Sequence, residues 1–307
     1  MRSNTPLAKY NILTKVLIVL GVILTCALLI VLTLKILLFF FLSDGYELNT
    51  QIILMKITQV IQSVFIFIIP ALVLSYLIST KPLKFLGLST RINYKIIIAS
   101  IIALVAALPL MDLLVTWNYY LEPPQFLKGF WEWSKAQELK GQEATRTLLE
   151  VSSFGGLAFN FFLVCILAAF SEELFFRGLL LGALCKTTKR KNLSIWIIAI
   201  LFSTIHMQFL GFFPRLLLGA LFGYLFIWTG SIWPSTLAHL TNNTIALIQF
   251  MKYGNEALTP PSIETNYTLT NCLLAFGGCI LFAVCCMYIY KTGSKRKNGE
   301  KRISSFT

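Results

Sequence analysis

The chain has 307 residues, of which 57% are hydrophobic and 13% charged, and it carries a formal net charge of +13. A soluble domain usually carries about 25% charged residues, so this composition excludes an ordinary soluble protein. The apolar residues fall in long runs, and about 20 apolar residues in a helix span the hydrocarbon core of a bilayer. We therefore predict an all-α polytopic membrane protein.

Eight transmembrane helices are predicted from the apolar runs. They cover roughly residues 16–42, 50–79, 95–117, 155–185, 193–210, 213–229, 231–252 and 267–290. The first run is too long for the apolar region of a signal peptide, so we interpret it as a retained span. The connection 118–154 mixes aromatic and charged residues, which is typical of a helix lying at the membrane interface. Such a helix could be a simple anchor, which we favour, or a lid that docks substrate.

Basic residues are dense in every second connection. They include Arg2, Lys9 and Lys15 at the N-terminus, Lys81, Lys84, Arg91 and Lys95 after the second span, Lys186, Lys189, Arg190 and Lys191 after the fourth, and Lys291, Lys295, Arg296, Lys297, Lys301 and Arg302 in the tail. By the positive-inside rule these segments, and hence both termini, are cytoplasmic. The excess charge thus orients the protein in a membrane, which we predict to be a bacterial plasma membrane, and does not indicate nucleic-acid binding.

Ionisable side chains inside spans are rare because each costs about 2.5–3.5 kcal/mol at the helix centre. The predicted spans contain Lys35, Lys56, Asp112, Glu172, Glu173, Arg177, His206, Arg215 and His239. Lys35, Lys56 and Arg215 lie near span ends or can snorkel, so we assign them no function. Asp112 remains a candidate, although a cap or a local pair would also explain it.

Two adjacent carboxylates lie in the fourth predicted span. Glu173 and Arg177 are four residues apart, so they share one face of a helix and can neutralise each other. Glu172 is rotated about 100° away around the helix and has no such partner. Because a desolvated carboxylate is a better proton acceptor near neutral pH, Glu172 is the candidate general base.

The other polar candidates lie at similar depth. At 1.5 Å per residue, Glu172 and His206 lie about 21 and 22 Å from the basic end of their helices. On the seventh predicted span, His239 lies roughly 13 Å and Asn243 roughly 19 Å from the preceding turn. Phe202 and His206, four residues apart, share a helix face, which puts an aromatic ring beside the first histidine. The spacing therefore predicts one interior cluster built from three helices.

These residues form three motifs, Glu172-Glu173-x-x-x-Arg177, Phe202-x-x-x-His206 and His239-x-x-x-Asn243. The ordered set resembles the CAAX protease and bacteriocin-processing (CPBP) family of intramembrane proteases, which includes the type II CAAX prenyl endopeptidases. That family carries E-E-x-x-x-R, F-x-x-x-H and H-x-x-x-N, each on a different transmembrane helix. The resemblance covers roughly residues 165–250, and the first 150 residues carry no diagnostic motif.

The resemblance implies hydrolysis of a peptide bond within the bilayer. It implies that Glu172 and His206 activate a water molecule for attack on the scissile carbonyl. The family is often described as metalloproteases, and Glu172, His206 and His239 could form a zinc site with an open position. There is no H-E-x-x-H motif, and an all-protein mechanism uses the same residues, so a divalent metal stays an open alternative.

The remaining motif residues would support this chemistry. The resemblance implies that His239 and Asn243 stabilise the developing oxyanion, which requires donors aimed at it in a dry site. It also implies that Glu173 and Arg177 hold the geometry of the site. The expected substrate is a membrane-associated or lipidated peptide, such as a prenylated C-terminus, a bacteriocin or pheromone leader, or a membrane-anchored signal remnant.

The predicted organisation has three parts. Residues 1–150 hold N-terminal helices and the interfacial connection, 151–252 the catalytic core, and 253–307 the last helix and basic tail. One alternative is a proton- or ion-coupled transporter, which would be expected to contain inverted repeats and broken helices. Another is a non-catalytic scaffold or immunity protein of the same family. The absence of a visible repeat and the complete motifs favour the protease.

Overall fold

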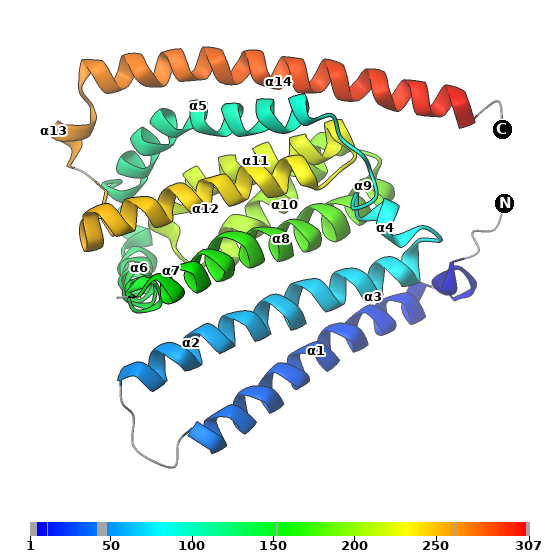
Figure 1. Ribbon diagram of the computed structural model, residues 1–307, viewed down its shortest axis with the longest axis horizontal. Helices are drawn as coiled ribbons and strands as arrows, with labels where there is room; N and C mark the ends of the chain where they lie inside the picture. The colour runs from blue at the N-terminus through cyan, green and yellow to red at the C-terminus, as the bar shows by residue number, and fades with distance from the viewer. Residues whose placement is uncertain (1–4, 11, 42–47, 152, 261, 305–307) are drawn as a thin grey trace.

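The computed structural model describes residues 5–10, 12–41, 48–151, 153–260 and 262–304, and these residues form helices and connecting segments without a β-strand. The prediction of an all-α membrane bundle is confirmed. Helices run side by side, with α1 (Ile12–Phe41) at one edge and α14 (Leu269–Ser304) at the other (Figure 1).

Membrane-spanning length and hydropathy pick out a smaller set of helices than the eight predicted. Five helices in the described ranges are long and apolar enough to cross a membrane, namely Ile52–Ile78, Tyr94–Tyr119, Phe154–Thr188, Phe209–Thr229 and Leu269–Gly293. Two shorter apolar helices, Leu17–Thr33 and Lys191–Ile205, accompany them. The predicted number of eight is therefore approximate.

The helices follow one another with short connections. After α1 come α2 (Leu48–Gln62), η2 (Ser63–Ile68), α3 (Ile69–Ile78), α4 (Pro82–Phe85), α5 (Tyr94–Tyr119), α6 (Lys128–Leu149), α7 (Phe154–Asn160), η4 (Phe161–Leu167), α8 (Ala168–Glu173), η5 (Leu174–Leu181), α9 (Gly182–Thr188), α10 (Lys191–Ile205), η6 (Phe209–Gly211), α11 (Phe212–Thr229), α12 (Trp233–Tyr253), α13 (Ile263–Asn266) and α14. Three of these segments, η2, η4 and η5, are π-helical stretches inside longer helices. Such π-turns often occur at functional sites.

Local sequence signals explain where several helices begin and end. The Asn93 side chain accepts a hydrogen bond from the Lys95 amide at 3.0 Å and caps α5. Gly230, with φ 71°, ends α11 in the left-handed conformation that glycine adopts without strain. Pro234 then lies in the first turn of α12, where its missing N–H leaves no partner unsatisfied.

Small residues allow α10 and α11 to approach closely. A Cβ added to Gly219 would lie 3.2 Å from the Phe202 ring and 3.3 Å from the Ala199 backbone. Gly223, one turn further along α11, faces Ile195 in the same way. This spacing of small residues is typical of tightly packed membrane helices. It brings the helix that ends at His206 against α11.

The basic segments gather at one end of the bundle. In Figure 1 the start of α1, the short helices α4 and α9, and the C-terminal end of α14 all lie at this end. Helix α6 lies at the opposite end and is seen along its axis, so it runs across the direction of the spanning helices (Figure 1). Exposed apolar side chains on and beside α6, including Phe130, Trp133 and Leu139, fit the predicted interfacial location.

The connection between α10 and α11 begins earlier than predicted. The fifth span was expected to reach residue 210, but α10 ends at Ile205 and His206 is its C-cap residue. Met207 has φ 58°, a left-handed conformation that interrupts the helix. Asn118 of α5 holds the turn that follows, donating from Nδ2 to the Phe209 carbonyl at 3.2 Å and accepting from the Phe213 amide at 3.0 Å.

The two hydrogen bonds made by the Asn118 side chain predict a stability effect remote from the motif residues. Asn118→Leu should destabilise the protein by about 1–3 kcal/mol for each of the two backbone groups left unpaired. Thermal unfolding in detergent checks this, with the exposed Asn255→Leu as a matched control. If Asn118→Leu unfolds at the same temperature as the control, these two hydrogen bonds contribute nothing to stability.

Candidate active site

Helix α8 and the π-helical turn η5 supply the first motif. The Glu173 carboxylate accepts a hydrogen bond from Arg177 at 2.8 Å, and both side chains are 0% exposed. The predicted pairing of residues four apart is therefore present in the structure. A buried ion pair of this kind needs further hydrogen bonds to offset its desolvation. Arg177 has one such bond, from its Nη2 to the Gly219 carbonyl at 3.1 Å.

Aromatic rings enclose the Arg177 guanidinium. Its central carbon lies 4.5 Å from the Phe202 ring centroid and 5.3 Å from that of Phe222. Cation–π contacts of this length stabilise a desolvated guanidinium by up to about 2 kcal/mol. Since Gly219 and Phe222 both lie on α11, this helix forms one wall of the site.

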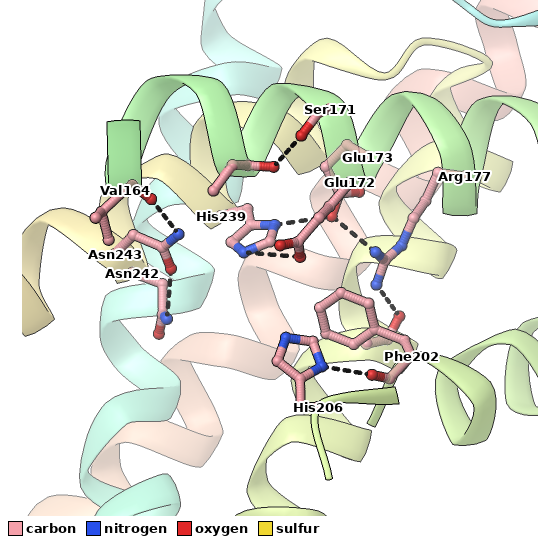
Figure 2. A network of polar contacts seen from close by, with 12 residues as sticks. Val164, Ser171, Glu172, Glu173, Arg177, Phe202, His206, His239, Asn242 and Asn243 are labelled. Atoms are coloured by element: carbon pink, nitrogen blue, oxygen red, sulfur yellow. Dashed lines mark hydrogen bonds and ion pairs between the residues drawn. The ribbon is translucent and has the colours of Figure 1, made fainter. Parts of the chain in front are cut away.

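His239 of α12 faces both of the adjacent carboxylates, with one ring nitrogen toward each (Figure 2). Its Nδ1 is 3.0 Å from the Glu173 carboxylate, and its Nε2 is 3.9 Å from Glu172 Oε2. The imidazole stacks on Phe222 with ring centroids 5.0 Å apart. An ionised carboxylate only accepts hydrogen bonds, so Nδ1 carries the proton and Nε2 faces Glu172.

The two carboxylates differ in their hydrogen-bond partners and in the exposure of their side chains. Glu173 accepts from both Arg177 and His239 and is fully buried, whereas the Glu172 side chain is 15% exposed. Glu172 Oε2 is itself buried and has no hydrogen-bond partner within the described chain. A separation of 3.9 Å is too long for a direct hydrogen bond, so Glu172 Oε2 and His239 Nε2 face each other without being bonded.

His206 approaches the cluster from the end of α10. Its Nδ1 lies 2.7 Å from the Phe202 carbonyl oxygen, and because a carbonyl only accepts, Nδ1 carries the proton. Nε2 is then left with a lone pair. The Phe202 ring lies between the two histidines, with centroids 5.0 Å from His206 and 6.0 Å from His239 (Figure 2).

Asn243 lies one turn after His239 on α12 but contacts a different helix. Its Nδ2 donates to the Val164 carbonyl at 2.9 Å, and its Oδ1 accepts from Asn242 at 3.4 Å (Figure 2). Val164 belongs to the π-helical segment η4. A π-turn offers carbonyl groups outside the regular α-helical pattern. One N–H of the Asn243 amide therefore holds α12 against this segment, and the other has no hydrogen bond to the described residues.

The other intramembrane charges lie apart from this cluster, with one exception. Lys56 is buried near the Phe159 ring, and Asp112 lines a separate cavity of about 780 Å³ that is also lined by Glu138 and Glu256.

The exception is Arg215, to which no function was assigned. It hydrogen-bonds to Gln208 in the connection after His206 and interacts electrostatically with Glu172. Its position nine residues after His206, in the first turn of the next span, was the signal that sequence reasoning passed over.

The predicted metal ligands are Glu172, His206 and His239, and a metal ion requires such ligands to converge on one point. Structural and catalytic zinc sites need at least three protein ligands converging on one point. Within the described residues, no group of three His, Cys, Asp or Glu side chains is close enough to hold an ion. Each histidine keeps Nε2 available for a ligand, so the misfit lies in the spacing of the three side chains and not in the histidine tautomers. As arranged, Glu172, His206 and His239 do not fit a bound metal, and we derive no step through one.

Comparison with known proteins adds the family assignment. Residues 154–245 match the family model described as type II CAAX prenyl endopeptidase Rce1-like. The matched segment contains all seven residues named in the three motifs. No curated protein and no solved structure matches the chain. Over residues 154–245 the chain thus matches the Rce1-like type II CAAX prenyl endopeptidase domain, which is consistent with a protease of the CPBP family.

Proposed function

We propose that this protein is an intramembrane endopeptidase that hydrolyses a peptide bond of a membrane-associated or lipidated peptide. One observation carries the proposal: Glu172 and His239 face each other across 3.9 Å, while Oε1 of the neighbouring Glu173 is bound by both His239 and Arg177. A water molecule beside this pair that donated one hydrogen bond to Glu172 Oε2 and one to His239 Nε2 would keep its lone pairs free for attack.

Hydrolysis would then proceed in two proton transfers. Glu172 takes a proton from the water as the oxygen attacks the scissile carbonyl carbon. The protonated Glu172 returns that proton to the leaving amine as the carbon–nitrogen bond breaks. His206, whose Nε2 carries a lone pair, can assist by accepting the water proton in place of Glu172 or beside it. This retains the predicted pair of Glu172 and His206 and adds His239 as a second group that orients the water.

Oxyanion stabilisation is assigned to His239 and Asn243, as the family resemblance implies. The second N–H of the Asn243 amide is unused by its bond to Val164, so it can donate to a developing negative charge. His239 can donate from Nε2 when it, in place of Glu172, takes the one proton that the water loses. Glu173 would then lie against the imidazolium and stabilise it, so we assign a positioning role to Glu173 and Arg177.

The catalytic core is assigned to residues 151–252, which enclose the matched segment and all motif residues. We assign the N-terminal helices 1–150 and the final segment 253–307 to the surrounding membrane bundle. The family description points to a prenylated C-terminal peptide as the substrate class. The gathering of basic segments at one end supports cytoplasmic termini, and a bacterial plasma membrane is the proposed location.

Cleavage assays on reconstituted protein test this function. We expect His206→Ala and His239→Ala to lower cleavage of an S-farnesylated peptide in liposomes by at least about 100-fold, the usual contribution of a positioned acid or base. Product masses locate the cleaved bond. A chelator added in parallel tests the metal alternative, because activity lost on chelation and restored by zinc would replace the all-protein mechanism. Wild-type rates in both histidine variants would refute the proposed site.

A further inference from the structure

Arg215 lies on the face of α11 that forms a wall of the candidate site. Residues 215, 219 and 222 are spaced four and three apart, so they share one helix face. Gly219 on this face accepts a hydrogen bond from Arg177, and Phe222 stacks on His239. The α-carbon of Arg215 is therefore one turn, about 6 Å along the helix, from the wall that contacts the catalytic cluster.

The Arg215 guanidinium is only partly used by its own chain. Nη1 donates to the Gln208 carbonyl at 3.0 Å, and Nη2 donates to Gln208 Oε1 at 3.3 Å. A guanidinium has five N–H donors, so three have no hydrogen bond to the part of the chain that the structure describes. No carboxylate among those residues lies within 4 Å of Arg215. Arg215 thus interacts electrostatically with Glu138 without a direct ion pair and keeps N–H donors available for a ligand.

Helix α6 fixes the orientation of this guanidinium. Gly141 packs so closely on the Gln208 side chain that a Cβ at this position would clash with it. Nearby, burial raises the pKa of the Glu138 carboxyl, and the positive charge of Arg215 opposes that rise. Phe130 and Trp133 pack on Phe209, at ring-centroid distances of 5.2 and 5.7 Å. The interfacial helix thus docks on the connection that holds Arg215 in place.

The charge of the site shows what Arg215 can recognise. The buried cluster contains two carboxylates, Glu172 and Glu173, but one arginine, Arg177, so an approaching anion would meet a net negative charge. Arg215 interacts electrostatically with Glu138 first and with Glu172 second, and it supplies positive charge beside the cluster. A guanidinium with free N–H groups favours a carboxylate, which it can bind through two parallel hydrogen bonds.

We propose that Arg215 binds a carboxylate group of the peptide that enters the site. The inference rests on the proposed function in that the ligand is a peptide. The carboxylate is either the free C-terminus of the leaving fragment or an acidic side chain near the cleaved bond. Arg215 is thereby a specificity-determining residue, held by Gln208 and α6 beside the catalytic cluster.

Equilibrium binding tests the proposal without relying on turnover. Three fluorescent S-farnesylated tetrapeptides are compared: Cys-Val-Leu-Ser with a free C-terminus, its C-terminal amide, and the amide of Cys-Val-Leu-Glu. They are titrated onto full-length Glu172→Gln protein in nanodiscs, with Arg215 intact, as Arg215→Gln or as Arg215→Lys. Arg146→Gln, which changes an arginine on α6 whose side chain is 48% exposed, is the matched control.

With Arg215 intact, the free-acid peptide should bind about tenfold or more tightly than its amide, the value of a charge-assisted hydrogen bond. Arg215→Gln should abolish this ratio and leave the Kd of the amide unchanged, whereas Arg215→Lys should keep part of it. Tight binding of the Cys-Val-Leu-Glu amide would identify an acidic side chain as the source of the carboxylate. The ratio is measured within each variant, so a partly unfolded sample does not distort it.

Two results would overturn the proposal. The first is equal binding of the free-acid and amide peptides with Arg215 intact. The second is an Arg215→Gln variant that weakens both peptides by the same factor, because that is the result expected of a structural role or of oxyanion stabilisation. A carboxylate preference that depends on Arg215 in a protein that cleaves no peptide would retain this inference and reject the protease function.

Discussion

Glu172→Gln is expected to lower the rate of peptide cleavage by about 10²- to 10⁴-fold while leaving the protein folded. The substitution keeps the shape of the side chain but removes its ability to take a proton. Glu172 Oε2 has no hydrogen-bond partner in the described chain, so the amide that replaces it breaks no existing bond. Initial rates on an S-farnesylated peptide in liposomes, with thermal unfolding of the same samples, provide the measurement.

The control for this prediction is Glu264→Gln, which neutralises an exposed carboxylate on α13. It should retain the wild-type rate. A Glu172→Gln protein that cleaves at the wild-type rate would exclude Glu172 as the general base. A Glu172→Gln protein that unfolds would instead assign this carboxylate a structural role, contrary to its partial exposure.

The second large effect concerns stability. Arg177→Met should destabilise the protein by about 3–5 kcal/mol, because it leaves the fully buried Glu173 carboxylate without its ion-pair partner. It also leaves the Gly219 carbonyl without the hydrogen bond from Nη2. Thermal or denaturant unfolding in detergent measures the change.

The double variant Glu173→Leu/Arg177→Met separates the two contributions. Removing both charges should recover part of the lost stability, since replacing a buried pair by apolar residues is often nearly neutral. Activity should remain low, because His239 then lacks the carboxylate that orients its ring. A double variant that is less stable than Arg177→Met alone would contradict this account of the pair.

Together these predictions assign different roles to two adjacent glutamates. Glu172 is expected to affect activity without affecting stability, and Glu173 to affect stability first. The difference comes from helix geometry, since neighbouring residues point about 100° apart and meet different surroundings. One side chain meets the guanidinium of its own helix, and the other meets the space beside His239.

Local spacing made much of the site predictable. The Glu173–Arg177 pair and the shared face of Phe202 and His206 follow from the i, i+4 geometry of a helix. Similar depths along the helices predicted that the motifs would meet. The long apolar runs predicted the helices, and the structure reproduces most of their bounds to within a few residues. The exceptions are the end of α10, where Met207 adopts a left-handed conformation, and the end of α14, which continues to Ser304 instead of ending near residue 290.

The tertiary contacts within the site were not predictable in this way. His239 is hydrogen-bonded to Glu173, 66 residues away in the sequence, and Asn243 is hydrogen-bonded to the Val164 carbonyl, 79 residues away. Which partner each side chain takes depends on helix rotation and on the π-turn in η4, which no local pattern encodes. Arg215 was set aside because its position in the first turn of a span resembled that of a snorkelling side chain.

The most direct test of peptide hydrolysis is cleavage of an S-farnesylated peptide by purified protein in liposomes prepared with water labelled with a heavy oxygen isotope. Mass spectrometry then locates the label in the products. We predict one cleaved peptide bond, with heavy oxygen in the new C-terminal carboxylate, in the wild-type protein and a loss of both in Glu172→Gln. Absence of cleavage, or labelled product that forms equally with Glu172→Gln, would contradict the account.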